Sequence, residues 1–90
     1  MTTVRTRAIV SGRVQGVGFR WSAQTEATSL GLVGFVRNRA DGTVEVEAEG
    51  ADDAVSTFTD WLTSGPPGAD VVSVEAETVA PTGGPGFQIR

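Results

Sequence analysis

The sequence contains no cysteine, no histidine and no lysine, so all seven of its basic residues are arginine. The missing cysteines exclude disulfide bonds, a thiol nucleophile and a thiolate metal site. The missing histidine removes the usual base of neutral pH and the commonest metal ligand. Any chemistry that this chain performs must therefore use other groups.

Long apolar runs and excess positive charge are also missing. Eleven acidic residues leave a formal net charge of −4, which should repel polyanions, so we expect no nucleic-acid partner. No apolar run approaches the ~20 residues that span a bilayer, and residues 1–5 lack the core of a signal peptide. We therefore expect no membrane association and a cytoplasmic location. The 90 residues predict one domain over 1–90, which can bury roughly 60 to 65% of its unfolded surface.

Three of the twelve glycines lie in the stretch 12–20, Gly-Arg-Val-Gln-Gly-Val-Gly-Phe-Arg. This stretch joins an apolar run to a segment with helical spacing, which predicts a loop between a first strand and a first helix. Loop N–H groups and the positive end of a helix dipole favour an anion there, and Arg20 adds a planar fork of donors. The alternative is that the glycines serve only a tight turn and that Arg20 is solvated.

The remaining pattern predicts five strands and two helices. Strands are expected over 4–11, 32–39, 43–49, 71–79 and 87–89, and helices over 19–30 and from 52 to the break at 65–68. This order is typical of an α+β fold, the ferredoxin-like split β-α-β sandwich, in which an antiparallel sheet carries two helices on one face. Its first two strands run parallel, so loop 12–19, Arg20 and Asn38 should converge at one edge. For Asn38 the alternative role is turn formation before Asp41-Gly42.

Two other features have competing interpretations. Glu45, Glu47 and Glu49 alternate with apolar residues, so we expect them to face water, with a metal site as the minor alternative. Trp21 lies off the apolar stripe of the first helix, and we expect a partly buried prop between elements rather than a substrate contact. The other arginines near the loop, Arg13, Arg37 and Arg39, are expected to be solvated or to play a supporting role.

The nine-residue stretch 12–20 closely resembles the signature of the acylphosphatase family. Further similar pieces follow in order over nearly the whole chain: Leu30-Gly31-Leu32, Gly34-Phe35-Val36-Arg37-Asn38, Asp41-Gly42-Thr43-Val44-Glu45-Val46, Gly65-Pro66-Pro67 and Phe87-Gln88-Ile89-Arg90. The departures are mild, since Phe35 stands where many members have tryptophan and Trp21 occupies a variable position. The resemblance implies hydrolysis of the carboxyl-phosphate bond of acyl phosphates.

The resemblance also implies roles for individual residues. The backbone N–H groups of Gln15, Gly16, Val17, Gly18 and Phe19 would hold the phosphate together with Arg20, and Asn38 would orient the attacking water. The leaving carboxylate has a conjugate acid of pKa ~4 and needs no general acid, so the missing histidine is no objection. We expect no metal, no cofactor, a monomer, and inorganic phosphate as product and inhibitor. The base is expected to be the substrate's own phosphate.

Two other functions fit the same fold. One is a non-catalytic anion-binding or regulatory module, which would bind acyl phosphate without turning it over. The other is an RNA-binding domain, which would need aromatic residues on an exposed sheet face and a basic surface. The glutamate row and the negative charge of the chain argue against the second.

Overall fold

The computed structural model of the chain describes residues 2–90. Its elements, in chain order, are β1 (Thr3–Arg13), α1 (Phe19–Ser29), β2 (Val33–Asn38), β3 (Val44–Ala51), α2 (Asp52–Ser64), β4 (Asp70–Val79) and β5 (Phe87–Ile89). The order of helices and strands is the one predicted from the sequence.

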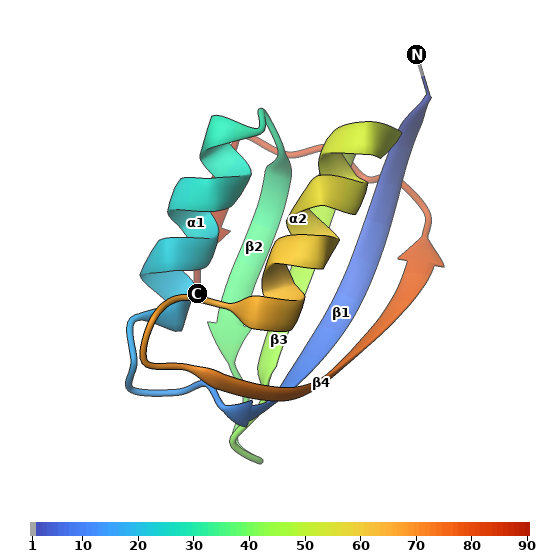
Figure 1. The fold of residues 1–90 in the computed structure, drawn as a ribbon. Helices are drawn as coiled ribbons and strands as arrows, with labels where there is room; N and C mark the ends of the chain where they lie inside the picture. The colour runs from blue at the N-terminus through green and yellow to red at the C-terminus, as the bar shows by residue number, and fades with distance from the viewer. Residues whose placement is uncertain (1) are drawn as a thin grey trace.

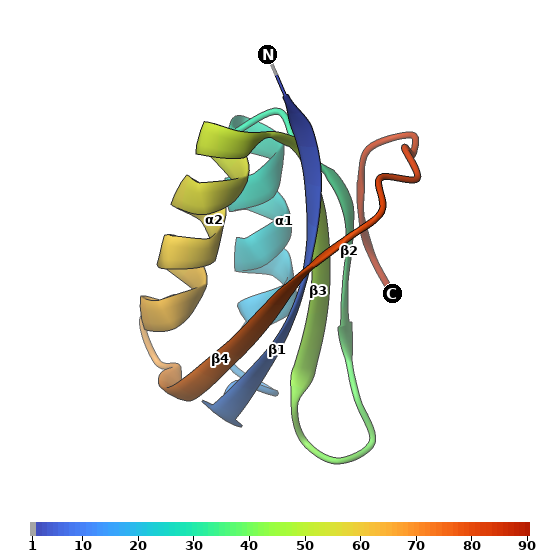
Figure 2. The same ribbon diagram turned by 90° about the vertical axis from the view of Figure 1, so that its right-hand side faces the viewer.

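One five-stranded sheet organises the structure, with strand order β4-β1-β3-β2-β5. The first four strands pair antiparallel, and β5 pairs parallel with β2 at the edge, so the sheet as a whole is mixed. Both helices cover the same face of this sheet (Figure 1), as the side view shows (Figure 2). This arrangement confirms the ferredoxin-like sandwich, in which β1 and β2 point the same way.

The core lies between the helices and the sheet because each element presents one apolar face. In the strands the inward residues alternate with outward ones, and in α1 they recur at Phe19, Ala23 and Ala27, as predicted. Gly31 ends this helix with a φ of 73°, a left-handed conformation that glycine adopts without strain. Buried core members include Val10, Val36, Val44, Val46, Phe58 and Leu62.

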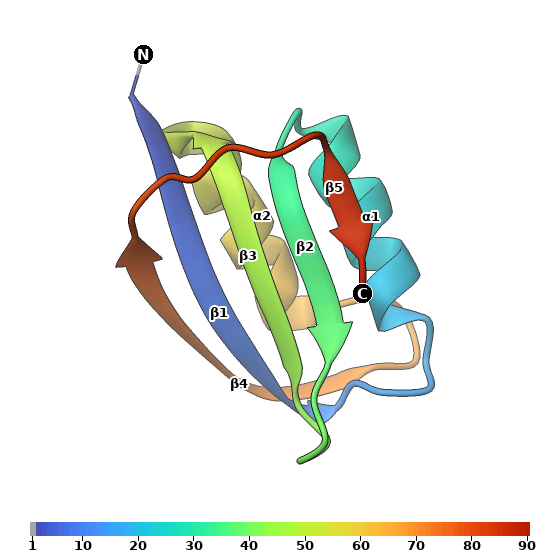
Figure 3. The ribbon, with the colours of Figure 1, turned by 180° about the vertical axis from the view of Figure 1, so that it is seen from behind.

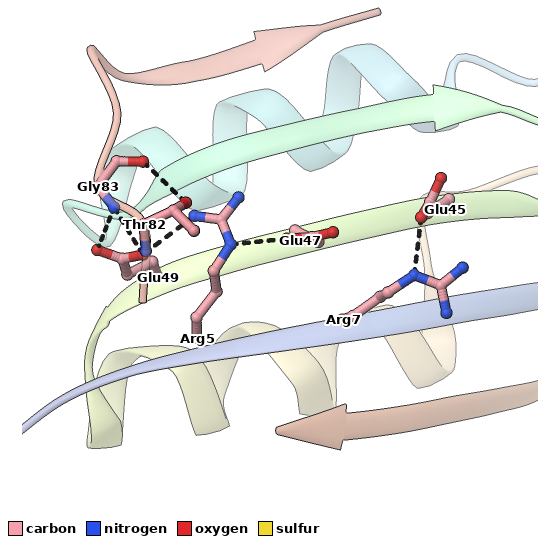
Figure 4. Close-up of polar contacts among 7 residues, drawn as sticks. All are labelled: Arg5, Arg7, Glu45, Glu47, Glu49, Thr82 and Gly83. Atoms are coloured by element: carbon pink, nitrogen blue, oxygen red, sulfur yellow. Dashed lines mark hydrogen bonds and ion pairs between the residues drawn. The ribbon is translucent and has the colours of Figure 1, made fainter. Parts of the chain in front are cut away.

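The opposite face of the sheet differs from the sequence prediction. Glu45 and Glu49 were expected to face water, but their residues are only 6% and 7% exposed. Arginines from the neighbouring strands explain this burial: Arg5 bonds Glu47 at 2.6 Å and Glu49 at 3.1 Å, and Arg7 bonds Glu45 at 2.8 Å. Arg37 of β2 pairs with Glu45 as well. These six side chains, Arg5, Arg7, Arg37, Glu45, Glu47 and Glu49, are called the ion-pair ladder below. Figure 4 shows all of them except Arg37.

The connection from β4 to β5 covers one end of the ladder. It crosses the sheet on the face away from the helices and reaches the far edge (Figure 3). Glu49 holds it there by accepting hydrogen bonds from the backbone N–H groups of Thr82 at 2.8 Å and Gly83 at 3.0 Å. The bond from Thr82, opposed by burial and supported by Gly83 and Arg5, keeps the pKa of Glu49 below its usual value.

A second difference concerns the first loop, which was predicted to begin at Gly12. Strand β1 continues to Arg13 through an irregularity between Ser11 and Gly12, where it pairs with the start of β4. A Cβ on Gly12 would lie 2.1 Å from the Asp70 carbonyl oxygen, so this glycine permits strand packing and is not part of the loop. The open loop is 14–18. No helix within residues 2–90 is long and apolar enough to cross a membrane.

Candidate functional site

The loop after β1, the start of α1 and the end of β2 meet at one end of the sheet (Figure 1). They enclose a hollow of about 190 Å³, called the α1 hollow below. Its lining residues are Val14, Gly16, Gly18, Phe19, Arg20, Trp21, Asn38 and Ile89. The convergence predicted from the topology therefore holds for the loop, Arg20 and Asn38, with β5 as an additional wall that the sequence did not indicate.

The loop backbone adopts a conformation that leaves its N–H groups unused. Gly16 and Gly18 have φ angles of 75° and 77°, and a Cβ on either would meet no atom within 4 Å. Within residues 2–90, no backbone N–H from Gln15 to Phe19 donates a hydrogen bond to another protein group. Alternation of left-handed glycines with other residues produces the backbone concavities that bind anions. Glycine is thus required here for conformation and not for space.

The side chain of Gln15 holds this loop in place. Its amide nitrogen donates to the Arg39 carbonyl at 2.8 Å and to the Thr43 carbonyl at 2.9 Å. Both acceptors lie in the β2–β3 hairpin, so the amide connects the loop to the strand end that carries Asn38. The sequence predicts a role only for the backbone N–H of Gln15, because a lone glutamine in a loop carries no signal of its side-chain partner.

The N-termini of the two helices differ in charge. The first turn of α2 contains Asp52 and Asp53, and Asp53 accepts a hydrogen bond from the Ala54 N–H at 2.8 Å. The first turn of α1 contains no acidic residue, and Gly18 offers no capping side chain. The positive end of the α1 dipole is therefore not compensated by the protein and favours an anion in the hollow.

Arg20 is partly buried and has no aspartate or glutamate carboxylate within ion-pair distance among residues 2–90. Its guanidinium donates one hydrogen bond, at 3.2 Å, to the main-chain oxygen of Arg90. The Arg90 side chain turns away from it and lies over the Phe35 ring, 4.2 Å from the centroid. Most of the Arg20 donor fork therefore remains available in the hollow.

Asn38 ends β2, and its side chain makes no hydrogen bond to the rest of residues 2–90. The hairpin turn is built by other groups: Asp41 accepts from the Thr43 N–H at 3.0 Å, and the Arg39 N–H donates to the Thr43 carbonyl at 2.8 Å. The turn-forming role considered for the Asn38 side chain is therefore wrong. Its amide lines the hollow and has no hydrogen-bond partner among residues 2–90.

Comparison with known proteins identifies the family and agrees with this fold. The sequence model of the Acylphosphatase family matches residues 6–89. The chain belongs to the acylphosphatase family. It is 53% identical over 88 residues to an acylphosphatase from Anaeromyxobacter dehalogenans, a match that covers 97% of this chain and 95% of the relative.

Solved acylphosphatase structures have the same fold. An acylphosphatase from Coxiella burnetii superposes with a TM-score of 0.95 at 39% identity, covering 98% of this chain and 93% of the other. The crystal structure of acylphosphatase from Bacillus subtilis gives a TM-score of 0.94 at 40% identity, with 97% and 98% covered. The match extends over essentially the whole fold of both proteins.

In this acylphosphatase fold the remaining sequence candidates lie outside the hollow. Arg13 donates to the Gly68 carbonyl at 3.2 Å, Arg37 belongs to the ion-pair ladder, and Arg39 approaches Asp41 at 3.9 Å. None of the three lines the hollow. Among residues 2–90, no group of three or more acidic, histidine or cysteine side chains could hold a metal ion.

Trp21 does not have the role that was favoured for it. A partly buried prop was expected, but Trp21 is 67% exposed. The aromatic that packs between elements is Trp61 of α2, whose ring lies 5.7 Å from that of Phe19 in α1. Trp21 follows Arg20 directly, so the turn of α1 that presents the arginine to the hollow also presents the indole near its rim.

Proposed function

We propose that this chain hydrolyses the carboxyl-phosphate bond of acyl phosphates, giving a carboxylate and inorganic phosphate, within one domain over residues 1–90. The observation that carries the proposal is the concentration of unused donors in the loop at the α1 hollow, which Gly16, Gly18 and Phe19 line. Five successive backbone N–H groups, from Gln15 to Phe19, have no internal partner among residues 2–90. Arg20 adds a cation that has no aspartate or glutamate partner among these residues.

Phosphate oxygens are the natural acceptors for these donors. The N–H groups of Gly16, Val17 and Gly18, with those of Gln15 and Phe19, surround the phosphate, and the Arg20 fork makes paired charge-assisted bonds to it. Each such bond contributes on the order of 1.5 to 3 kcal/mol. Donors that are already oriented collect the charge of the phosphoryl group in the transition state without reorganising.

Asn38 acts on the water. Its amide both donates and accepts hydrogen bonds, and in the α1 hollow it is not committed to another group within residues 2–90. It orients a water in line with the departing carboxylate oxygen, and the substrate's own phosphate accepts the proton of that water. The departing carboxylate is stable as an anion, so no protein group has to protonate it.

Several properties follow from this mechanism as parts of the proposal. The reaction needs no metal and no cofactor, and inorganic phosphate competes with the substrate for the loop and Arg20. The protein acts as a monomer on a small-molecule substrate, because all proposed groups come from one chain. The cytoplasmic location stays a prediction from the sequence.

The test is hydrolysis of benzoyl phosphate by the purified protein, followed beside two variants. Arg20→Gln should lower kcat/KM at least about a hundredfold, since it removes two charge-assisted bonds. Arg13→Gln is the matched control, because Arg13 points to Gly68 and lies outside the hollow, and it should behave like the wild type. Equal activity of Arg20→Gln and the wild type would contradict the proposed site.

The alternative is an anion-binding or regulatory module without catalysis. It uses the same donors and leaves Asn38 without a role. A protein that binds phosphate, as measured by calorimetry, and does not accelerate benzoyl phosphate hydrolysis would establish this alternative.

A further inference from the structure

Exposed apolar side chains are concentrated beside the α1 hollow. Among residues 2–90 the large apolar side chains left exposed are Trp21 at 67%, Val72 at 81% and Ile89 at 39%. Two of these three, Trp21 and Ile89, line the hollow. Apolar surface that borders a polar site commonly contacts a ligand. The phosphate donors alone do not account for an indole and an isoleucine in this place.

Trp21 also lines a second hollow, of about 220 Å³, formed by α1, Trp61 of α2 and the segment after α2. Called the proline hollow here, it is lined by Trp21, Ser22, Thr25, Glu26, Trp61, Gly65, Pro66 and Pro67. Its apolar lining residues include two tryptophans and two prolines, and Glu26 is its one charged side chain. A group that leaves the α1 hollow past Trp21 therefore stays in contact with apolar surface.

We propose that Trp21 binds the acyl group of the substrate and makes this enzyme selective for acyl phosphates with aromatic or long apolar acyl groups. The proposal rests on the proposed function, because the phosphate end must sit on the loop and Arg20 for the acyl end to reach Trp21. Ile89 contacts the carbons nearest the phosphate, and the proline hollow receives the far end of the group. Glu26 repels acyl groups that carry a second negative charge.

The physical reason for selectivity is the area available to each substrate. An acetyl group is too short to cover the indole, whereas a benzoyl or octanoyl group can lie on it and remove apolar surface from water. Each fully buried methylene changes affinity by about fourfold, and contact on one side by less. A succinyl group is comparable in length to a benzoyl group, but it brings a carboxylate towards Glu26 and should be disfavoured.

The test compares kcat/KM for acetyl, succinyl, benzoyl and octanoyl phosphate in the wild type, Trp21→Ser and Val72→Ser. Val72 is the matched control because it is also an exposed apolar residue and lines neither hollow. The wild type should prefer the benzoyl and octanoyl substrates. Trp21→Ser should lose about tenfold on these two, mainly through KM, and less than twofold on the others. Val72→Ser should match the wild type.

Inhibition by inorganic phosphate separates contact with the acyl group from a structural effect. In Trp21→Ser the inhibition constant should stay unchanged, because phosphate does not touch the indole. An equal loss on all four substrates together with weaker phosphate inhibition would overturn the proposal, since Trp21 would then only position Arg20 or the loop. Unchanged selectivity in Trp21→Ser would overturn it too. Failure of the wild type to hydrolyse any of the four would instead refute the proposed function itself.

Discussion

Arginine serves two opposite purposes in this molecule. In the ion-pair ladder Arg5, Arg7 and Arg37 are each bonded to a glutamate on β3, so their charges are neutralised inside the protein. In the α1 hollow Arg20 bonds only a main-chain oxygen. A cation whose partner is built in contributes to structure, whereas a cation without one attracts an anion from solution.

Each glutamate of the ladder accepts at least one hydrogen bond from an arginine. Burial alone would raise the pKa of Glu45, but the hydrogen bonds from Arg7 and Arg37 outweigh it and hold this pKa below its usual value. The hollow lacks any such carboxylate among its lining residues. The same contrast separates the two helix N-termini, since the first turn of α2 contains Asp52 and Asp53 and the first turn of α1 contains no acidic residue.

The largest effect is expected when Arg20 is replaced by a residue that keeps the positive charge but lacks the planar guanidinium. Arg20→Lys should lower kcat/KM about a hundredfold or more, because an ammonium cannot make the paired bonds of a guanidinium. Steady-state kinetics with benzoyl phosphate measures this loss, and Arg13→Lys, outside the hollow, is the control. An Arg20→Lys enzyme with wild-type kcat/KM would show that only charge matters here.

Removing the Asn38 amide should separate binding from chemistry. Asn38→Ala should lower kcat on the order of 30-fold to 100-fold and leave KM and phosphate inhibition nearly unchanged, because the amide contacts the water and not the substrate. The melting temperature must be measured alongside, since Asn38 ends β2. A kcat that falls only in proportion to unfolded protein would identify Asn38 as a structural residue.

Replacing Gly18 of the loop by alanine should weaken anion binding, although the added methyl group would meet no atom within 4 Å. Gly18→Ala forces alanine into a left-handed conformation at a cost of about 1 kcal/mol. The loop can relieve this strain by rotating its N–H groups, so phosphate should bind about fivefold more weakly. Gly31→Ala is the matched control. Gly31 has a φ of 73°, close to the 77° of Gly18, and a Cβ at either position would meet no atom within 4 Å, but Gly31 lies past the other end of α1. The melting temperature should fall by a similar amount in both variants.

Changing the ladder should affect stability and leave catalysis alone. The pKa values of Glu45 and Glu49 lie below their usual values in the folded protein, so their stabilising effect is present above pH ~4.5 and is lost as the pH falls through the folded values. Glu49→Gln should lower the melting temperature at pH 7 by several degrees and should lose less additional stability on acidification than the wild type does.

The control for this variant is Glu75→Gln, because Glu75 is exposed and has no ion-pair partner within residues 2–90. It should leave both the melting temperature and its pH dependence almost unchanged. No ladder residue lines the α1 hollow, so kcat/KM should stay within twofold of the wild type in both variants. A large loss of activity in Glu49→Gln would mean that the two regions are coupled.

The smallest effect is expected from chelation. Equal rates before and after exhaustive treatment with a chelator should be observed, since arginine and backbone donors supply the charge that a metal would otherwise provide. Activity that is lost on chelation and restored by one divalent ion would contradict the proposed mechanism.

Much of this architecture could be predicted because the information is local. Alternation in 43–49 and the four-residue spacing of Phe19, Ala23 and Ala27 identify elements through their own periodicity. The order of elements then restricts the topology, and parallel β1 and β2 bring the loop to Asn38. The loop glycines were predictable for the same reason, since left-handed conformations leave a direct signal in the sequence.

Partners across the sheet could not be predicted, because they depend on register and on what covers each face. Alternation places Glu45 and Glu49 on one face of β3, but only pairing with β1 and β2 brings Arg5, Arg7 and Arg37 beside them and buries them. The exposure of Trp21 and the position of Ile89 in the hollow could not be predicted for the same physical reason. Whether a side chain off the apolar stripe is covered depends on elements distant in the sequence, and here β5 and the loop at Gly65 leave the indole exposed at the rim of the site.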